Sequence, residues 1–239
     1  MKTVILTVTD IMNYKIKGDS LPVVICELTQ GETILSEAGA MGWMSDNIKM
    51  DTNMKGGFFK GIARAFAGES VFLNTFTCLN QPGTIAFPSS FPGQIVAKQL
   101  APGEYIICQK GAFLAGESSV TVEAYFKKKL GAGFFGGEGF ILQKITGPGM
   151  VFLEIDGHVE EYNLAPGQVM KVDTGHVALF ESSVHFDVET VKGIKNIFFG
   201  GEGLFLTTLT GPGKVYLQTM PIQNLAGQIS RYFNVGSSD

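Results

Sequence analysis

The feature that most constrains the fold of this chain is a set of turn and strand signals that recurs three times. A glycine turn comes first, a second glycine follows 8 residues later, and a β-branched residue stands 9 residues further on, with the same intervals in every copy. The positions are Gly31, Gly39 and Ile48; Gly103, Gly111 and Val120; and Gly167, Gly175 and Val184. Internal repetition indicates a structure built from copies of one supersecondary unit.

Two later signals complete each copy. A Phe- and Gly-rich stretch ends in Gly-Glu, and a Pro-Gly dipeptide follows that glutamate after 13, 10 and 10 residues. The dipeptides are at 82–83, 148–149 and 212–213. We interpret the chain as one compact domain, 1–239, with three repeats at about 18–83, 89–149 and 152–213, N-terminal strands and a C-terminal helix.

Strand patterns fill the spaces between these signals. Residues 120–126 and 184–191 alternate between apolar and polar side chains, whereas 140–145 and 204–209 are more continuously apolar. Alternation is typical of strands with one wet face, and apolar runs are typical of strands covered on both faces. Each unit is predicted to form four strands, and together the units predict an all-β barrel or sandwich. The 31 glycines and 19 phenylalanines suit many short strands joined by tight turns.

Two segments depart from the β pattern. Apolar residues spaced by four predict a short amphipathic helix over 57–67, within the first repeat. Near the end, Pro221 precedes apolar residues at helical spacing, which predicts a C-terminal helix over 222–233. We expect this terminal helix to pack on the β domain.

Several motifs together resemble a known family. They are Gly39-Ala40 with Trp43, the run 64–70 (RAFAGES), the run 72–76 (FLNTF), and the later Gly-Gly-Glu-Gly and Gly-Pro-Gly pairs. Across nearly the whole chain, the sequence is similar to the uncharacterised bacterial relatives of the mitochondrial biogenesis protein "altered inheritance of mitochondria twenty-four". The resemblance implies a fold like the ring-forming tryptophan RNA-binding attenuation protein, a shortened relative of the double-stranded β-helix, and it implies a homo-oligomer.

The resemblance carries no catalytic residue, and the likeness to the attenuation protein concerns fold, so neither RNA nor tryptophan binding is implied. The N-terminus has no Arg- and Ser-rich transit pattern, which favours a bacterial, cytoplasmic protein. No apolar stretch approaches the roughly 20 residues that span a bilayer. A net charge of −4 gives no electrostatic reason to expect nucleic acid.

Groups for catalysis are scarce. The three histidines, His158, His176 and His185, have no metal-site spacing and are expected at the surface. The cysteines, Cys26, Cys78 and Cys108, lack any CxxC pattern and are expected to be buried thiols. No nucleophile elbow, phosphate loop or dinucleotide motif is present, and no cofactor is expected.

Two groups of repeated residues are candidate sites. Glu69, Glu138 and Glu202 occupy equivalent positions, so an approximate three-fold axis would bring them together around a cation or shared protons. Alternatively, each glutamate accepts hydrogen bonds within its own turn or stays in water.

The second group lies in the Phe- and Gly-rich stretches, where phenylalanines stand near cations. These residues would contact an anionic membrane surface or a partner; alternatively, they pack inward or at a subunit interface. The group comprises Phe58, Phe59, Arg64, Phe134, Phe135, Phe198 and Phe199.

Charged residues make up 17% of the chain, below the roughly 25% of ordinary soluble domains, which favours extra surface buried against copies of itself. We therefore expect a non-enzymatic homo-oligomeric scaffold or interaction protein that acts alone, with another protein or at a membrane surface. The alternative is a small-ligand or metal-binding β module, and an unrecognised enzyme ranks behind both.

Overall fold

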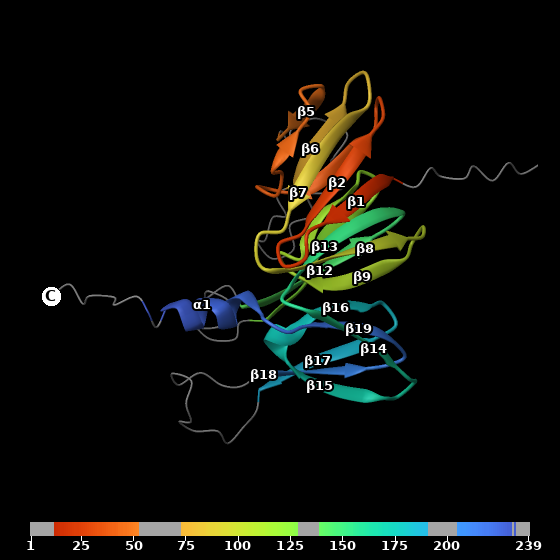
Figure 1. Ribbon diagram of the computed structural model, residues 1–239. Coiled ribbons are helices and arrows are strands. Elements are labelled where there is room, and N and C mark those ends of the chain that lie inside the picture. The colour runs from red at the N-terminus through yellow and green to blue at the C-terminus, as the bar shows by residue number, and fades with distance from the viewer. Residues whose placement is uncertain (1–11, 53–72, 129–138, 191–204, 231, 233–239) are drawn as a thin grey trace, which may run out of the picture.

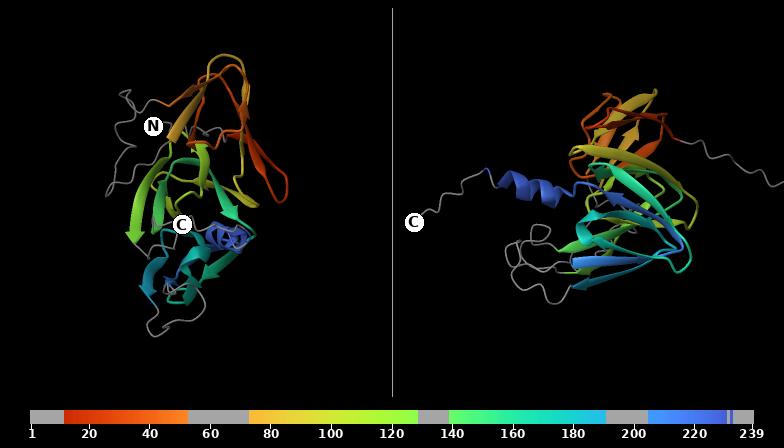
Figure 2. Two further views of the ribbon diagram at one scale, coloured as in Figure 1. Left: turned by 90° about the vertical axis from the view of Figure 1, so that its left-hand side faces the viewer. Right: turned by 60° about the horizontal axis from the view of Figure 1, so that its bottom comes forward.

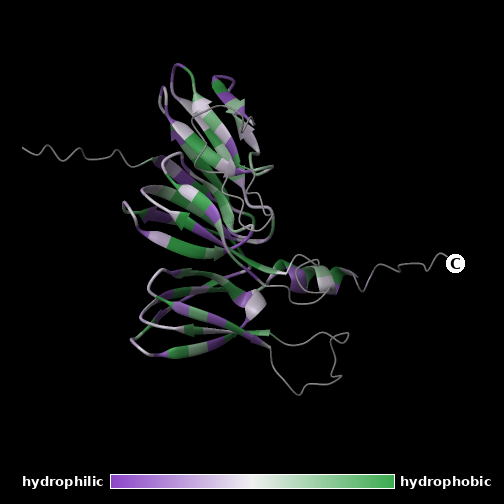
Figure 3. Cartoon of the chain, turned by 180° about the vertical axis from the view of Figure 1, so that it is seen from behind, coloured by the Kyte–Doolittle hydropathy of each residue, from purple (hydrophilic) through white to green (hydrophobic). Residues whose placement is uncertain are grey.

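The computed structural model describes residues 12–52, 73–128, 139–190, 205–230 and 232, and the fold is given for these ranges. Almost all regular structure is β, and the strands form four sheets (Figure 1). Figure 3 shows apolar and polar residues alternating along many of these strands. The chain is therefore a stack of sheets whose cores lie between neighbouring layers.

The sheets are numbered here from the N-terminal end of the stack. Sheet 1 has the order β1 (Asn13–Lys17), β2 (Val23–Leu28), β7 (Gly83–Pro88), β4 (Trp43–Met44). Sheet 2 has the order β5 (Ile48–Asp51), β6 (Leu73–Cys78), β3 (Thr33–Glu37), β10 (Phe113–Glu117), β13 (Gly149–Asp156), β8 (Gly93–Leu100).

The second half of the chain forms two more sheets. Sheet 3 has the order β11 (Thr121–Lys128), β12 (Phe140–Thr146), β9 (Tyr105–Gln109), β16 (Val177–Glu181), β19 (Gly213–Gln218), β14 (Val159–Leu164). Sheet 4 has the order β15 (Val169–Asp173), β18 (Phe205–Thr210), β17 (His185–Thr190). The helical elements are η2 (Thr174–His176) and α1 (Ile222–Ser230).

The two inner sheets are built in the same way. In sheet 2 the strand β3 pairs with β10, and in sheet 3 the strand β9 pairs with β16, both antiparallel. Each junction joins three strands from one stretch of the chain to three strands from the next. Successive segments are thus connected by strand pairing as well as by packing.

Three apolar clusters occupy the spaces between the sheets. Phe76, Phe87 and Phe152 belong to the first cluster, Phe113 to the second and Phe180 to the third. All five rings are at most 1% exposed. At roughly 1.5–3 kcal/mol for each fully buried large side chain, these clusters are the main source of stability.

The predicted all-β class is confirmed, and of the two forms it is sandwich-like, because no sheet of the described ranges closes into a barrel. The prediction of four strands per unit is wrong: the described part of 89–149 holds five complete strands, β8 to β12, and that of 152–213 holds five, β14 to β18. Gly111 has a φ of +88° and turns the chain between the short strands β9 and β10. The division into three repeats and the likeness to the attenuation protein stay predictions.

The predicted C-terminal helix is present as α1, which ends at Ser230. It contacts the β domain at its start, where Ile222 and Gln223 are half-buried, but none of its residues is fully buried. Figure 2 shows α1 projecting from the side of the stack. The predicted helix over 57–67 lies outside the described residues. No helix in the described ranges combines the length and the apolar content that crossing a membrane requires.

Candidate functional site

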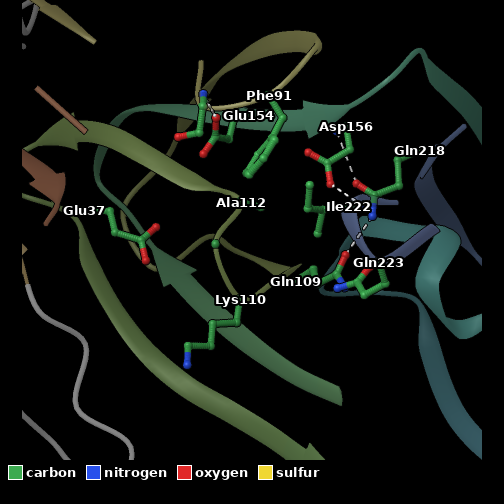
Figure 4. A pocket seen from close by; sticks show the side chains of 12 residues that line it. Glu37, Phe91, Gln109, Lys110, Ala112, Glu154, Asp156, Gln218, Ile222 and Gln223 are labelled. Atoms are coloured by element: carbon green, nitrogen blue, oxygen red, sulfur yellow. Dashed lines mark hydrogen bonds between the residues drawn. The ribbon is translucent and has the colours of Figure 1, made fainter. Parts of the chain in front are cut away.

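A pocket of about 270 Å³ lies where the middle of the stack meets the start of α1. Its walls come from the end of β3, the turn between β9 and β10, the loop before β8, the end of β13, and α1 (Figure 4). The side chains that give it chemical character are Glu37, Phe91, Gln109, Glu154, Asp156 and Gln218.

Two of the three carboxylates in this pocket accept hydrogen bonds from neighbouring segments. Glu154 accepts from the Ser90 backbone N–H at 2.7 Å and from the Ser89 hydroxyl at 3.1 Å. Asp156 accepts from the backbone N–H of Ile222, the first residue of α1, at 2.9 Å. These carboxylates therefore hold the loop before β8 and the start of α1 against the end of β13.

Burial raises the pKa of all three carboxyl groups. The charge of Glu154 further raises the pKa of Glu37, whereas the Lys110 ammonium lowers it. Hydrogen bonds from Ser90 and Ser89 oppose the rise at Glu154. The pocket is consequently a place where negative charge is costly and only partly compensated.

Buried glutamines complete the opposite wall. The Gln218 amide nitrogen donates to the Gln109 side-chain oxygen at 2.8 Å and to the Gly175 carbonyl at 2.8 Å. The Gln218 side-chain oxygen accepts from the Asp156 backbone N–H at 3.3 Å. Nearby, the side-chain oxygen of Gln223 is buried and has no hydrogen-bond partner.

This arrangement suits binding of a small group that donates hydrogen bonds or carries positive charge. The Cys108 thiol, on the strand that carries Gln109, is fully buried, and burial raises its pKa, so it is no nucleophile. Within the described ranges, no group of three or more His, Cys, Asp or Glu side chains is placed to hold a metal ion.

Two edge strands, one in sheet 1 and one in sheet 4, are further candidate binding surfaces. On sheet 1, β4 pairs only with β7, and on sheet 4, β15 pairs only with β18, in the part of the chain that the structure describes. Trp43 on β4 is 52% exposed, and Val169 on β15 is 56% exposed. Open edges with apolar side chains are sites where further strands can add.

Comparison with known proteins places the chain in a family. Residues 14–220 match the family described as mitochondrial biogenesis AIM24. The chain belongs to this family. A protein of Streptococcus pyogenes serotype M6, described as uncharacterised, is 28% identical over 225 residues, which is 91% of this chain and 89% of the relative.

A solved structure has a similar fold. A crystal structure of a Streptococcus pyogenes protein, a structural genomics target, matches with a TM-score of 0.74 and 26% sequence identity. The match covers 93% of this chain and all of the solved chain. These two proteins support the fold, and their descriptions name no activity.

The candidate residues predicted from the three repeats lie outside the described part of the chain. The glutamates of the predicted axial site, Glu69, Glu138 and Glu202, lie outside the described residues. So do the residues of the predicted interface or membrane contact, Phe58, Phe59, Arg64, Phe134, Phe135, Phe198 and Phe199. Both hypotheses stay predictions.

The other titratable residues fall largely as predicted. His158 and His185 are exposed, and His158 lies 3.4 Å from Glu160. His176 is half-buried, and its Nδ1 lies 2.7 Å from the Gln218 carbonyl oxygen. All three cysteines are buried and unpaired by disulfides, and burial raises the pKa of the Cys26 thiol to about 12.

The pocket was missed in the sequence, although the repeat intervals contain a signal for it. Glu37 stands 6 residues after Gly31, and Gln109 stands 6 residues after Gly103. Glu154 and Gln218 each stand 5 residues after the glycine of a Pro-Gly dipeptide. Polar residues in apolar strands at matching positions would have identified a contact between neighbouring repeats.

Proposed function

We propose that this AIM24-family protein is a non-enzymatic scaffold that works as a homo-oligomer. The observation that carries the proposal is the difference in size between the inner and outer sheets. Within the described ranges, sheets 2 and 3 have six strands each, whereas sheet 1 has four and sheet 4 has three. Association between copies would cover edges that the chain leaves open, and it would use the pairing that already joins its own segments.

The exposed apolar side chains support this proposal. Trp43 and Val169 are more than half exposed on strands at the two ends of the stack. Tryptophan is enriched among the residues that dominate protein interfaces, because its large ring buries much apolar surface at a small cost in conformational entropy. The low charge content of the whole chain points in the same direction.

Native mass spectrometry tests the proposal directly. We expect discrete species at multiples of the 25.7 kDa chain at micromolar concentration, with no additional mass. Sedimentation velocity at several concentrations gives an independent measure of the same assembly. A chain that stays at 25.7 kDa across this range would overturn the proposal.

A second candidate function is supported by the pocket. Glu37, Glu154 and Asp156 bring three partly compensated carboxyl groups to one cavity, and the Phe91 ring lies beside them (Figure 4). An ammonium group would relieve the repulsion and pack against the ring. The candidate is therefore a binding module for a small amine.

Thermal denaturation with putrescine as the probe tests this candidate. Putrescine at millimolar concentration should raise the melting temperature more than sodium chloride of equal ionic strength, and Glu154→Gln should reduce that difference. An equal rise in melting temperature with putrescine and with sodium chloride would contradict the small-amine function. The membrane-surface alternative depends on the Phe- and Gly-rich stretches and forms no part of this proposal.

A further inference from the structure

The pairing that joins the chain's own segments has a constant register. Ser36 of β3 lies opposite Ala115 of β10, and the next pair along is Leu35 with Gly116. Cys108 of β9 lies opposite Leu179 of β16, and the next pair is Ile107 with Phe180. The same strand positions therefore meet at both junctions.

The edge strands β15 and β4 contain the residues that match those paired at the two junctions, β3 with β10 and β9 with β16. On β15, Val172 stands 5 residues after Gly167, as Ser36 does after Gly31 and Cys108 does after Gly103. On β4, Trp43 stands 4 residues after Gly39, as Ala115 and Leu179 stand 4 residues after Gly111 and Gly175. Thus β15 is the repeat equivalent of β3 and β9, and β4 is the repeat equivalent of β10 and β16.

We infer that β15 of one copy pairs antiparallel with β4 of a second copy, with Trp43 opposite Val172 and Met44 opposite Lys171. This inference rests on the proposed homo-oligomer and names its contact. The two strands lie in sheets at opposite ends of the stack, so they cannot pair with each other within one molecule (Figure 1).

Residues at the two internal junctions are buried, whereas the matching residues on β4 and β15 that the partner would cover are exposed. Ala115 and Leu179 are both 0% exposed, whereas Trp43 at the matching position is 52% exposed. Leu35 and Ile107 are each 1% exposed, whereas Lys171 is exposed. The strand β4 also has only two residues, whereas β10 and β16 have five each, as suits a strand without its second neighbour.

Pairing would join sheet 4 of one copy and sheet 1 of the next copy into one continuous sheet. The three strands of sheet 4 and the four strands of the next copy's sheet 1 would form the order β17-β18-β15-β4-β7-β2-β1. In this sheet, the pairing of β15 with β4 stands where β3 meets β10 in sheet 2. Because the two edges differ, the contact is head-to-tail, and repeating it closes a ring or extends a row of copies.

Single substitutions test the contact. Trp43→Glu puts a charge into the junction and should reduce the assembly to the 25.7 kDa chain at micromolar concentration in native mass spectrometry. Tyr162→Glu is the matched control, because Tyr162 is an exposed aromatic residue on β14, an edge strand of sheet 3 that the inference leaves out. This control should keep the wild-type mass. Circular dichroism of both variants verifies that they are folded.

Paired cysteines test the register. In Met44→Cys/Lys171→Cys the new thiols should meet only between copies, so mild oxidation should give a ladder of chain multiples on a non-reducing gel. Met44→Cys/Glu189→Cys is the control, because Glu189 lies on β17, at the far edge of sheet 4 from β15. As a positive control, Ser36→Cys/Ala115→Cys lies at the equivalent junction within one chain, one residue pair away from the level of Met44 and Lys171, and should close an intramolecular disulfide.

The outcomes separate the two proposals. Dissociation by Trp43→Glu together with a ladder from the first cysteine pair supports the β15–β4 contact. A wild-type oligomer that survives Trp43→Glu and gives no ladder overturns this contact and leaves the homo-oligomer standing. A wild-type protein that is monomeric throughout overturns both.

Discussion

The Gln218 side chain donates a hydrogen bond of 2.8 Å to Gln109, a residue 109 positions earlier in the chain, and both side chains are buried. The contact links β9 to β19, two strands of sheet 3 that are separated by β16. Gln218 also binds the Gly175 carbonyl and the Asp156 N–H, so one amide holds three segments around the pocket.

Removing this amide should destabilise the fold. Gln218→Ala leaves the Gly175 carbonyl, the Gln109 oxygen and the Asp156 N–H without their partner, and we expect a loss of about 2 kcal/mol. The melting temperature should fall by roughly 4–8 °C for a chain of this size. Gln168→Ala is the control, since Gln168 makes a similar hydrogen bond to Ala165 in an exposed turn. Equal effects of both substitutions would contradict the role assigned to Gln218.

Glu37 occupies the position in the first repeat that Gln109 occupies in the second, and its carboxylate predicts a pH-dependent effect. Burial and the charge of Glu154 raise the pKa of Glu37, so the folded protein holds this proton at a pH where the unfolded chain has lost it. The free energy of unfolding therefore falls as the pH rises from about 4. Glu37→Gln should raise the melting temperature by about 2 °C at pH 7 and leave it unchanged near pH 3.

The control for Glu37→Gln is Glu27→Gln on β2. Glu27 is half-exposed and pairs with Lys15 at 3.2 Å, so its removal should lower stability slightly or leave it unchanged. Thermal melts of the three proteins between pH 3 and pH 8 provide the measurement. A stabilisation by Glu37→Gln of equal size at every pH would show that its carboxylate charge is not the cause.

Replacing the glycine of either later Pro-Gly dipeptide is predicted to destabilise the fold. Gly149 has φ +141°, and a Cβ there would lie 2.8 Å from the Ser119 hydroxyl and 2.9 Å from the Glu117 carboxylate. That carboxylate accepts the Met150 N–H at 3.0 Å. Gly149→Ala should displace it and cost about 2–3 kcal/mol from strain and the lost bond.

Gly103→Ala is the control for the Gly149 substitution. Gly103 also has a positive φ, +80°, but a Cβ there would meet no atom within 4 Å. The backbone strain alone should cost about 1 kcal/mol, clearly less than at Gly149. Urea denaturation measures both losses, and a ranking in the opposite order would rule out the proposed collision with Glu117.

Asp156 is predicted to anchor α1. Its carboxylate accepts the Ile222 N–H at the start of a helix that buries none of its own residues. Asp156→Ala should therefore speed hydrogen exchange over 222–230 about tenfold, which corresponds to a loss of about 1.4 kcal/mol in local stability. The strands of sheet 2 should exchange at the wild-type rate. Unchanged exchange in α1 would mean that the helix is held by other contacts.

The sequence by itself determined the all-β class, the family and the place of the C-terminal helix. Alternation along 184–191, the Pro-Gly turns and the apolar spacing after Pro221 are local patterns, and local patterns specify local structure. The glycines at matching intervals also indicated equivalent segments, because a turn that needs positive φ restricts the residue type at that position.

Only the tertiary structure decided which segments meet. Strand period and turn chemistry are the same whether β9 pairs with β16 or with another strand, so no local pattern selects that neighbour. The pocket assembles residues from Glu37 to Gln223, and its raised pKa values arise from burial that forms only when the sheets stack. The open edges of β4 and β15 are likewise a property of the complete set of pairings, because an edge is defined by the strand that is missing beside it.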